Sequence, residues 1–159
     1  MTSIKWLVLL CLFALTPVFP AGAAEPLTME IHLVQEPSKA LSADRGRALH
    51  VSEYRASKFR VVPGLSQRNT NSVSLELVGA KNFFLRHQEG IIKAHERPKK
   101  INLLFEGDAS WKIVKLAENR IRIESVNYPG DFITVREDGN VVKSRNPPLE
   151  KSTFVMMPR

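Results

Sequence analysis

Two stretches of the chain share one pattern, and this repetition constrains the fold more than any other feature. Residues 121–135 alternate apolar and polar positions, pass through a turn-rich Asn-Tyr-Pro-Gly sequence, and alternate again. Residues 73–87 have the same form at a constant offset of 48 positions, which places Phe84 opposite Phe132 in the comparison. Alternation interrupted by turn residues is typical of two short strands in a hairpin. The chain therefore contains an internal repeat of β-hairpin type.

A second pattern, an aromatic residue that opens a short alternating run, occurs three times, at Phe59, Trp111 and Phe154. Together with the hairpins it divides the chain into three units of four strands each. We place these units at about residues 29–65, 66–117 and 118–159. Units that cannot bury their own apolar faces must close on one another. The sequence therefore predicts an all-β domain over residues 29–159, a β-trefoil of three four-stranded repeats, with a sandwich or a three-bladed array as the alternative.

The first residues have the composition of an export signal. Lys5 is followed by an apolar run over residues 6–19 and by the small residues 21–24. This order predicts a secretory signal peptide over residues 1–24, and hence a secreted or periplasmic protein without a membrane span after cleavage. The single cysteine, Cys11, lies inside this segment, so the mature chain is expected to contain no disulfide.

The charge of the chain is strongly basic. The formal net charge is +7, and removal of the segment with Lys5 leaves +6 (7 − 1). Such a surface favours anionic partners, and export argues against nucleic acid as one of them. A candidate loop for an anionic polymer contains four basic residues. They are Lys93, Arg97, Lys99 and Lys100. The alternative is that these side chains are only solvated.

Several short motifs resemble one known family. These are Phe84-Leu85-Arg86-His87, Asp108-Ala109-Ser110-Trp111, Ser125-Val126-Asn127-Tyr128-Pro129-Gly130 and Phe59-Arg60-Val61-Val62-Pro63-Gly64-Leu65. Their order resembles the arabinofuranose-binding β-trefoil domain of α-L-arabinofuranosidase B, a carbohydrate-binding module, mainly over residues 59–159. The resemblance implies non-catalytic binding of arabinofuranosyl groups in shallow pockets, up to one in each repeat.

The resemblance also implies a ligand-binding set, which is Phe84, Arg86, His87 and Asp108. A carboxylate accepts hydrogen bonds from sugar hydroxyls, an imidazole exchanges one more, and an aromatic face covers the ring. Only the second repeat keeps this set. In the third repeat Thr134, Val135 and Lys151 stand at the matching positions. One pocket is therefore expected. The alternative is that His87 bonds to backbone at a strand end and Asp108 caps a turn. Phe84 recurs at an equivalent position of another repeat, which favours a core role for it, and Tyr128 is either an exposed aromatic platform or only part of a turn.

The leading hypothesis is a lectin-like exported domain that binds an arabinofuranosyl-type or anionic glycan and is not an enzyme. No cofactor or metal is expected, because the four histidines lack ligand-type spacing. The alternative hypothesis is a protein-interaction or inhibitor module that uses its basic loop or the connector 66–72. A third hypothesis is a small hydrolase in which Glu106 and Asp108 share one face of a strand.

Overall fold

The computed structural model describes residues 27–67, 71–117 and 119–159. The predicted signal peptide lies outside the described residues. Within them, no helix is long and apolar enough to cross a membrane.

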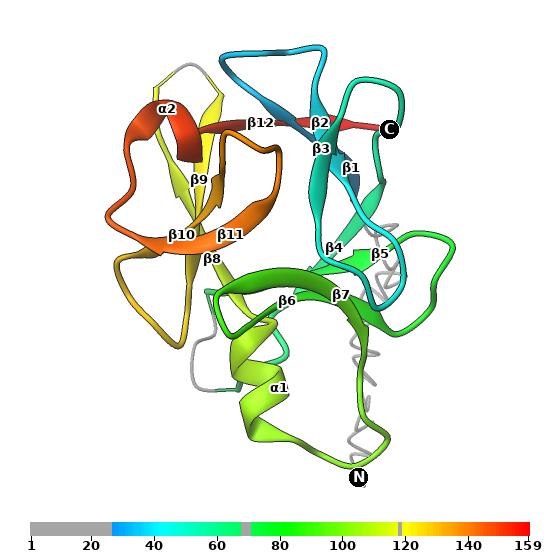
Figure 1. Cartoon of the computed structure of the whole chain (residues 1–159). Helices are drawn as coiled ribbons and strands as arrows, with labels where there is room; N and C mark the ends of the chain where they lie inside the picture. The colour runs from blue at the N-terminus through cyan, green and yellow to red at the C-terminus, as the bar shows by residue number, and fades with distance from the viewer. Residues whose placement is uncertain (1–26, 68–70, 118) are drawn as a thin grey trace, which may run out of the picture.

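The described residues form twelve strands and two short helices (Figure 1). We call β1–β4 the first unit, β5–β8 the second and β9–β12 the third. The first unit contains β1 (Thr28–Leu33), β2 (Ala40–Ser42), β3 (His50–Ser52) and β4 (Phe59–Pro63). The second contains β5 (Val73–Leu77), β6 (Phe83–Gln88), β7 (Ile91–Glu96), α1 (Leu103–Asp108) and β8 (Trp111–Lys115). The third contains β9 (Arg120–Ser125), β10 (Asp131–Val135), β11 (Val141–Arg145), α2 (Leu149–Ser152) and β12 (Phe154–Pro158).

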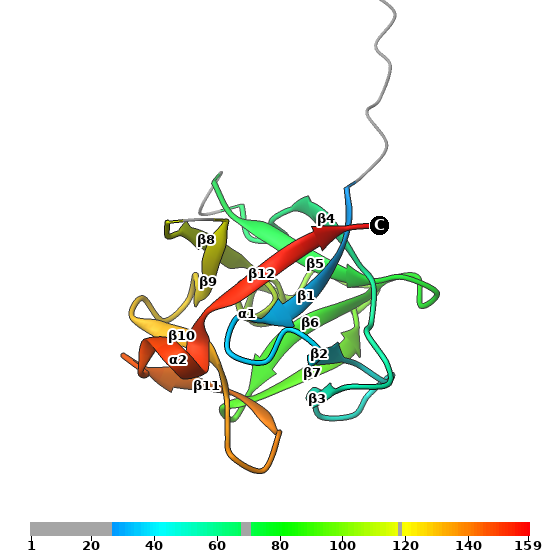
Figure 2. The same cartoon turned by 90° about the horizontal axis from the view of Figure 1, so that it is seen from above.

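The first and last strands of the units pair into a closed ring. β1 pairs with β4, β4 with β5, β5 with β8, β8 with β9, β9 with β12, and β12 with β1, all antiparallel. Figure 2 shows β12 lying beside β1, where the two ends of the described chain meet. The middle strands of the units pair as the hairpins β2–β3, β6–β7 and β10–β11. The fold is therefore a six-stranded barrel with three further hairpins, an all-β architecture as the sequence predicted.

Equivalent residues of the three units fill the centre of this barrel. The first, second and fourth strands of each unit each contribute one large apolar side chain that is 0% exposed. These are Ile31, Leu75 and Ile123; Leu41, Leu85 and Ile133; and Phe59, Trp111 and Phe154. All belong to one hydrophobic cluster, so the units share a single core.

The repeated pattern in the sequence corresponds to repeated hydrogen bonds. Glu76 accepts a bond from the backbone N–H of Asn82 at 2.9 Å, and Glu124 accepts one from Gly130 at 2.8 Å. Asn82 and Gly130 both have positive φ, 64° and 88°. The constant sequence offset therefore reflects one turn geometry that each of these two units builds around a half-buried or buried glutamate.

The helix α1 differs from the expectation that Glu106 and Asp108 share one face of a strand. Asn102 precedes it with extended backbone, and its Oδ1 accepts a bond from the N–H of Phe105 at 3.0 Å. This N-cap satisfies a donor that a helix end leaves free. The apolar run Leu103-Leu104-Phe105 is too short to show helical periodicity, so the sequence does not distinguish a helix from a strand here.

Candidate functional site

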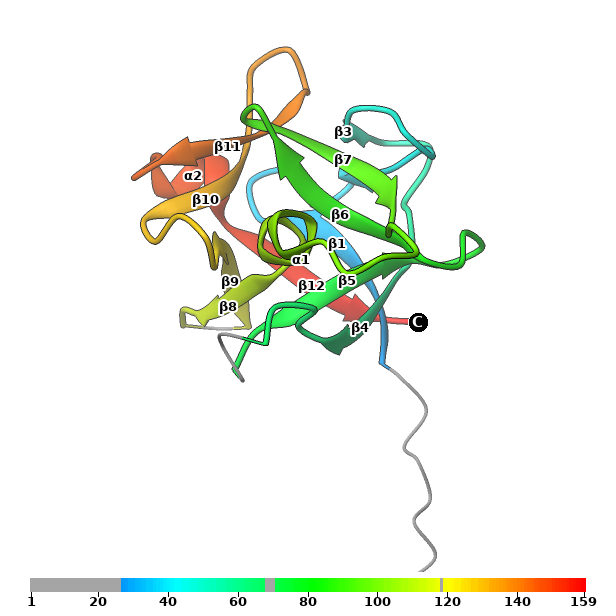
Figure 3. The same ribbon diagram turned by 90° about the horizontal axis from the view of Figure 1, so that it is seen from below.

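Three of the four predicted site residues meet in the second unit. Arg86 and His87 lie on β6, and Asp108 is the last residue of α1, which packs against β6 (Figure 3). Arg86 Nη2 donates to Asp108 Oδ2 at 2.9 Å, and His87 Nε2 lies 3.6 Å from Asp108 Oδ1. These contacts of Asp108 are with side chains, whereas a turn cap would bond to backbone N–H groups. The carboxylate instead joins two side chains of the neighbouring hairpin.

The third unit supplies residues that the sequence did not single out as contacts. Asn127 Nδ2 donates to Asp108 Oδ1 at 2.9 Å, and Ser125 Oγ lies 3.1 Å from His87 Nε2. A glycine makes this approach feasible, because a Cβ on Gly107 would lie 2.2 Å from Asn127 Oδ1. Ser125 and Asn127 both belong to the motif at residues 125–130. In the sequence this motif indicates a turn, and nothing in it indicates a contact with the second unit.

His87 is held neutral by its surroundings. Burial lowers the pKa of His87 from 6.5 to about 4; the Asp108 carboxylate opposes this effect, whereas Lys143 and Arg86 add to it. The rings of Trp111 and Tyr128 stand edge-on to the imidazole, with centroids at 5.8 and 5.3 Å. At neutral pH the imidazole is therefore an uncharged hydrogen-bonding group next to a carboxylate–guanidinium pair.

Phe84 does not have the place that the resemblance implied. Its side chain is buried and packs with Phe105 and Ala109 in a small cluster. Arg86 lies over this cluster, with its Cζ 5.1 Å from the centroid of the Phe105 ring. The ring of Phe84 thus supports the site from below and would not cover a sugar. The exposed aromatic at this place is Tyr128, which is 46% exposed.

The predicted basic loop is only partly a loop. Lys93 lies in β7, directly opposite Arg86 in the β6–β7 register. Arg97 Nη2 donates to Glu106 Oε1 at 2.6 Å, which balances its charge. Lys99 and Lys100 are solvent-exposed and lie in a loop, as predicted for a candidate anionic-polymer site.

The paired-carboxylate hypothesis receives no support from this geometry. Glu106 is committed to Arg97, and Asp108 to Arg86 and Asn127. Neither carboxylate is placed with the other across a cleft, as a glycosidase pair would be. In the part of the chain that the structure describes, no group of three or more His, Cys, Asp or Glu side chains could hold a metal ion.

Comparison with solved structures supports the fold. A β-trefoil described as BEL is 12% identical with a TM-score of 0.66, over 89% of this chain and 99% of that chain. An arabinofuranosidase complexed with arabinofuranosyl-α-1,2-xylobiose is 13% identical with a TM-score of 0.67, over 83% of this chain and 31% of that chain. A mosquitocidal holotoxin is 10% identical with a TM-score of 0.68, over 85% of this chain and 17% of that chain. This chain thus spans less than a third of the enzyme and of the toxin, and its fold is that of a β-trefoil.

The sequence of this chain matches a family model but no curated protein. A comparison with curated proteins finds no significant match. Residues 32–154, in contrast, match the alpha-L-arabinofuranosidase B (ABFB) domain. This match covers most of the chain and includes all three units, as well as the Arg86–Asp108 pair. It agrees with the motifs of the second and third units. The chain therefore belongs to the alpha-L-arabinofuranosidase B (ABFB) domain family.

Proposed function

We propose that this chain is a non-catalytic, lectin-like carbohydrate-binding domain that takes arabinofuranosyl groups at its second unit. The observation that carries the proposal is the meeting of Arg86, His87 and Asp108 in a chain that belongs to this domain family. These are residues to which the resemblance assigns sugar contacts. The fold and the family match support carbohydrate binding as the general role.

The polar groups of the site retain capacity for a sugar. An ionised carboxylate has about four acceptor positions, and Arg86 and Asn127 use two of those on Asp108. The Nε–H of Arg86 is buried and has no hydrogen-bond partner among the described residues. Sugar hydroxyls both donate and accept, so they complement a carboxylate and a guanidinium side by side.

Tyr128 would provide the apolar contact. Its ring is partly exposed next to His87, and Lys143 Nζ lies 3.7 Å from the ring centroid on the third unit. The C–H face of a furanose ring packs well on an aromatic side chain. In this arrangement Phe84 is a supporting residue, and the sugar lies between β6 and the β9–β10 turn.

The wider organisation forms part of the same proposal. The three units correspond to about residues 29–65, 66–117 and 118–159, and the chain is secreted or periplasmic after removal of residues 1–24. Recurrence of the four-strand order and of the core triplets supports the unit boundaries. The commitment of Glu106 and Asp108 to arginines supports a binding role rather than catalysis.

Calorimetric titration of the mature protein with arabinofuranosyl oligosaccharides tests the proposal. We expect Asp108→Asn to weaken binding at least tenfold, and Tyr128→Ala to weaken it with little effect on folding. Glu96→Gln is the matched control, because it also removes one negative charge but lies exposed at the end of β7. Circular dichroism checks that each variant is folded. Absence of binding by the folded wild-type protein would contradict the proposal.

A second candidate function is recognition of a protein partner, and one surface feature favours it. Ile101, Leu103 and Leu104 are 81%, 66% and 64% exposed, next to Lys99 and Lys100. A cluster of exposed apolar side chains is typical of an interaction surface. Leu103→Ser with Leu104→Ser should abolish capture of such a partner. Retention of the partner by this double variant would exclude the surface.

A further inference from the structure

The strand registers align the first unit with the second residue by residue. Phe59 pairs with Leu77 as Trp111 pairs with Ser125, so Phe59 and Trp111 are equivalent. Asp108 lies three residues before Trp111, and Ala56 lies three residues before Phe59. Ala56 therefore occupies the place of the site carboxylate in the first unit.

The hairpins align in the same way. Ala40 pairs with His32 as Phe84 pairs with Glu76. Three positions further along, Ala43 takes the place of His87. Counting from the equivalent residues Leu77 and Ser125 gives the remaining pairs. Gly79 stands for Asn127 and Ala80 for Tyr128. The side chains that fill the second-unit site are thus reduced to three alanines and a glycine.

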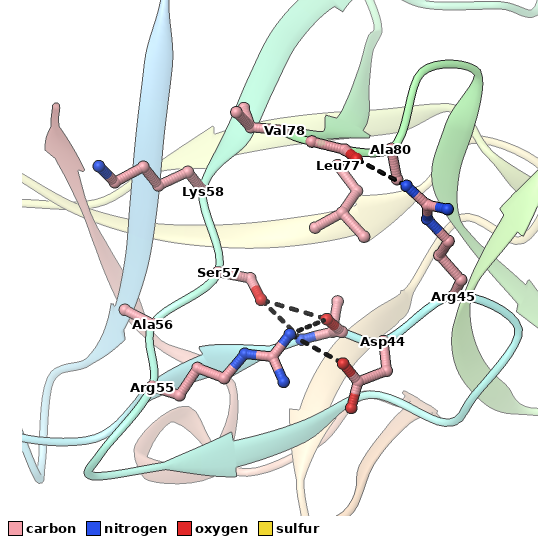
Figure 4. Close-up of a pocket in the computed structure, with 11 residues that line it drawn as sticks. Asp44, Arg45, Arg55, Ala56, Ser57, Lys58, Leu77, Val78 and Ala80 are labelled. Carbon is pink, nitrogen blue, oxygen red and sulfur yellow. Dashed lines mark hydrogen bonds and ion pairs between the residues drawn. The ribbon is translucent and has the colours of Figure 1, made fainter.

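The missing side chains leave a cavity of about 520 Å³ at this place (Figure 4). Its lining includes Ala43, Ala56, Gly79 and Ala80, which are the four positions just aligned. Leu77 and Val78 add apolar surface. A volume of several hundred Å³ is typical of sites for small organic ligands. The first unit therefore has an open hollow where the second unit has a filled site.

The rim of this cavity is basic. Arg45, Arg55 and Lys58 line it together with one carboxylate, Asp44, which gives a formal charge of +2 (3 − 1). In Figure 4 the guanidinium groups of Arg45 and Arg55 point toward the cavity from opposite sides, whereas the side chain of Lys58 points away from it. An anionic ligand would be attracted to it, whereas the second-unit site is closer to neutral at its centre.

The cations differ in how firmly they are held. Arg45 Nη2 donates to the carbonyl of Gly79 at 2.7 Å, and its Cζ lies 5.5 Å from the centroid of the Phe83 ring. Its guanidinium is thus fixed at one wall with further N–H groups unused. Arg55 pairs with Asp44 at 2.8 Å in an exposed setting, so this contact exchanges readily with a ligand carboxylate. The ammonium group of Lys58 is exposed and makes no ion pair with the described residues.

We propose that the first-unit cavity binds a carboxylate-bearing sugar, a uronic acid residue. Arg55 contacts the carboxylate, Arg45 contacts ring hydroxyls, and Leu77 and Ala80 face the apolar side of the ring. The cavity is larger than a lone inorganic anion requires, and it has both apolar and cationic walls. The choice of a saccharide rests on the proposed carbohydrate-binding function, but the site is separate from the one at Asp108.

Titration with trigalacturonate, monitored by calorimetry and by backbone amide NMR, tests this inference. We expect binding with shifts of the Ala43, Gly79 and Ala80 amides, and no comparable binding of the uncharged galactotriose. Arg45→Gln with Arg55→Gln should weaken binding at least tenfold. Lys112→Gln with Lys115→Gln is the matched control, because it removes the same charge from exposed positions of β8 and should change binding less than twofold. Ala56→Leu should block the cavity with no change of charge.

Each opposing result has a definite meaning. Equal loss in the two double variants would show a general charge effect and overturn the inference, as would equal binding of galactotriose. Inorganic phosphate that displaces trigalacturonate at equal concentration would reduce the site to a simple anion site and overturn the sugar assignment. Arabinofuranoside binding, measured on the same samples, separates the two proposals. If the wild-type protein binds arabinofuranoside but not trigalacturonate, only the first-unit site is refuted. If it binds trigalacturonate but not arabinofuranoside, only the second-unit function is refuted.

Discussion

At the scale of single residues, the second-unit site is a set of polar groups that hold one another in place. Asp108 receives hydrogen bonds from Arg86 and Asn127, and His87 lies against the same carboxylate. Gly107 permits this by leaving room for the Asn127 side chain. Because the groups are mutually restrained, a ligand would meet a preorganised surface and lose little free energy in ordering it.

The depressed pKa of His87 predicts a pH dependence of stability. In the unfolded chain this histidine takes up a proton below about pH 6.5, whereas burial delays protonation in the native state until about pH 4. The unfolded state therefore binds more protons in this window, so the contribution of His87 to stability is complete above pH 6.5 and is lost as the pH falls toward 4.

Urea unfolding of the wild type and of His87→Gln at several pH values between 4 and 7 measures this effect. We expect the free energy of unfolding of the wild type to fall more steeply with decreasing pH than that of the variant. His95→Gln is a useful comparison, because burial also lowers the pKa of His95, a half-buried residue outside the site. Parallel curves for the wild type and His87→Gln would contradict the assignment of a neutral, buried His87.

The motifs contained part of this site, and physical reasons explain the rest. Arg86, His87 and Asp108 could be recognised from the sequence because they occur in short contiguous segments. The contact between Asn127 and Asp108 could not, since it depends on how the third unit folds against the second. The burial of Phe84 was open for a similar reason, because alternation alone does not decide which neighbours cover a side chain.

At the scale of elements, the helix α1 positions the site carboxylate. It is only six residues long, and such a helix has little intrinsic stability. Asn102 at its start and the packing of Phe105 against Phe84 hold it in place. The period-2 pattern predicted strands such as β7 and β9 correctly, because buried and more exposed residues alternate along them. It did not predict α1, whose apolar run fits a strand equally well.

Removal of the N-cap should therefore affect both stability and binding. We expect Asn102→Ala to lower the free energy of unfolding by about 0.5–2 kcal/mol, because the N–H of Phe105 loses its acceptor. It should also weaken arabinofuranoside binding by displacing Asp108. Thermal unfolding and calorimetry measure the two effects. Asn140→Ala, in an exposed turn far along the sequence, should leave ligand affinity unchanged.

At the scale of the whole molecule, the closed ring of strands sets how the units depend on one another. β12 joins β1, so the last strand of the third unit completes the first. The equivalent aromatics Phe59, Trp111 and Phe154 meet the same core. The internal repeat predicted this closure in outline, because no unit buries its own apolar face. The sequence could not show that the first-unit site is open while the second is filled.

Loss of one core aromatic side chain should destabilise the entire barrel, because the three units share one core. We expect Phe154→Ala to lower the free energy of unfolding by about 3–5 kcal/mol, because the side chain is fully buried and its removal leaves a cavity. The transition should stay cooperative when followed by Trp fluorescence and by far-ultraviolet circular dichroism. Separate transitions for the two probes would show that the units unfold independently, contrary to the shared core.

An amide NMR titration of the mature protein with methyl α-L-arabinofuranoside tests whether the second unit binds the sugar through Arg86, His87, Asp108 and the exposed Tyr128. We predict saturable shifts of these amides, with the loop at residues 97–102 unaffected. A folded protein whose spectrum does not change, or changes only at that loop, would contradict the claim.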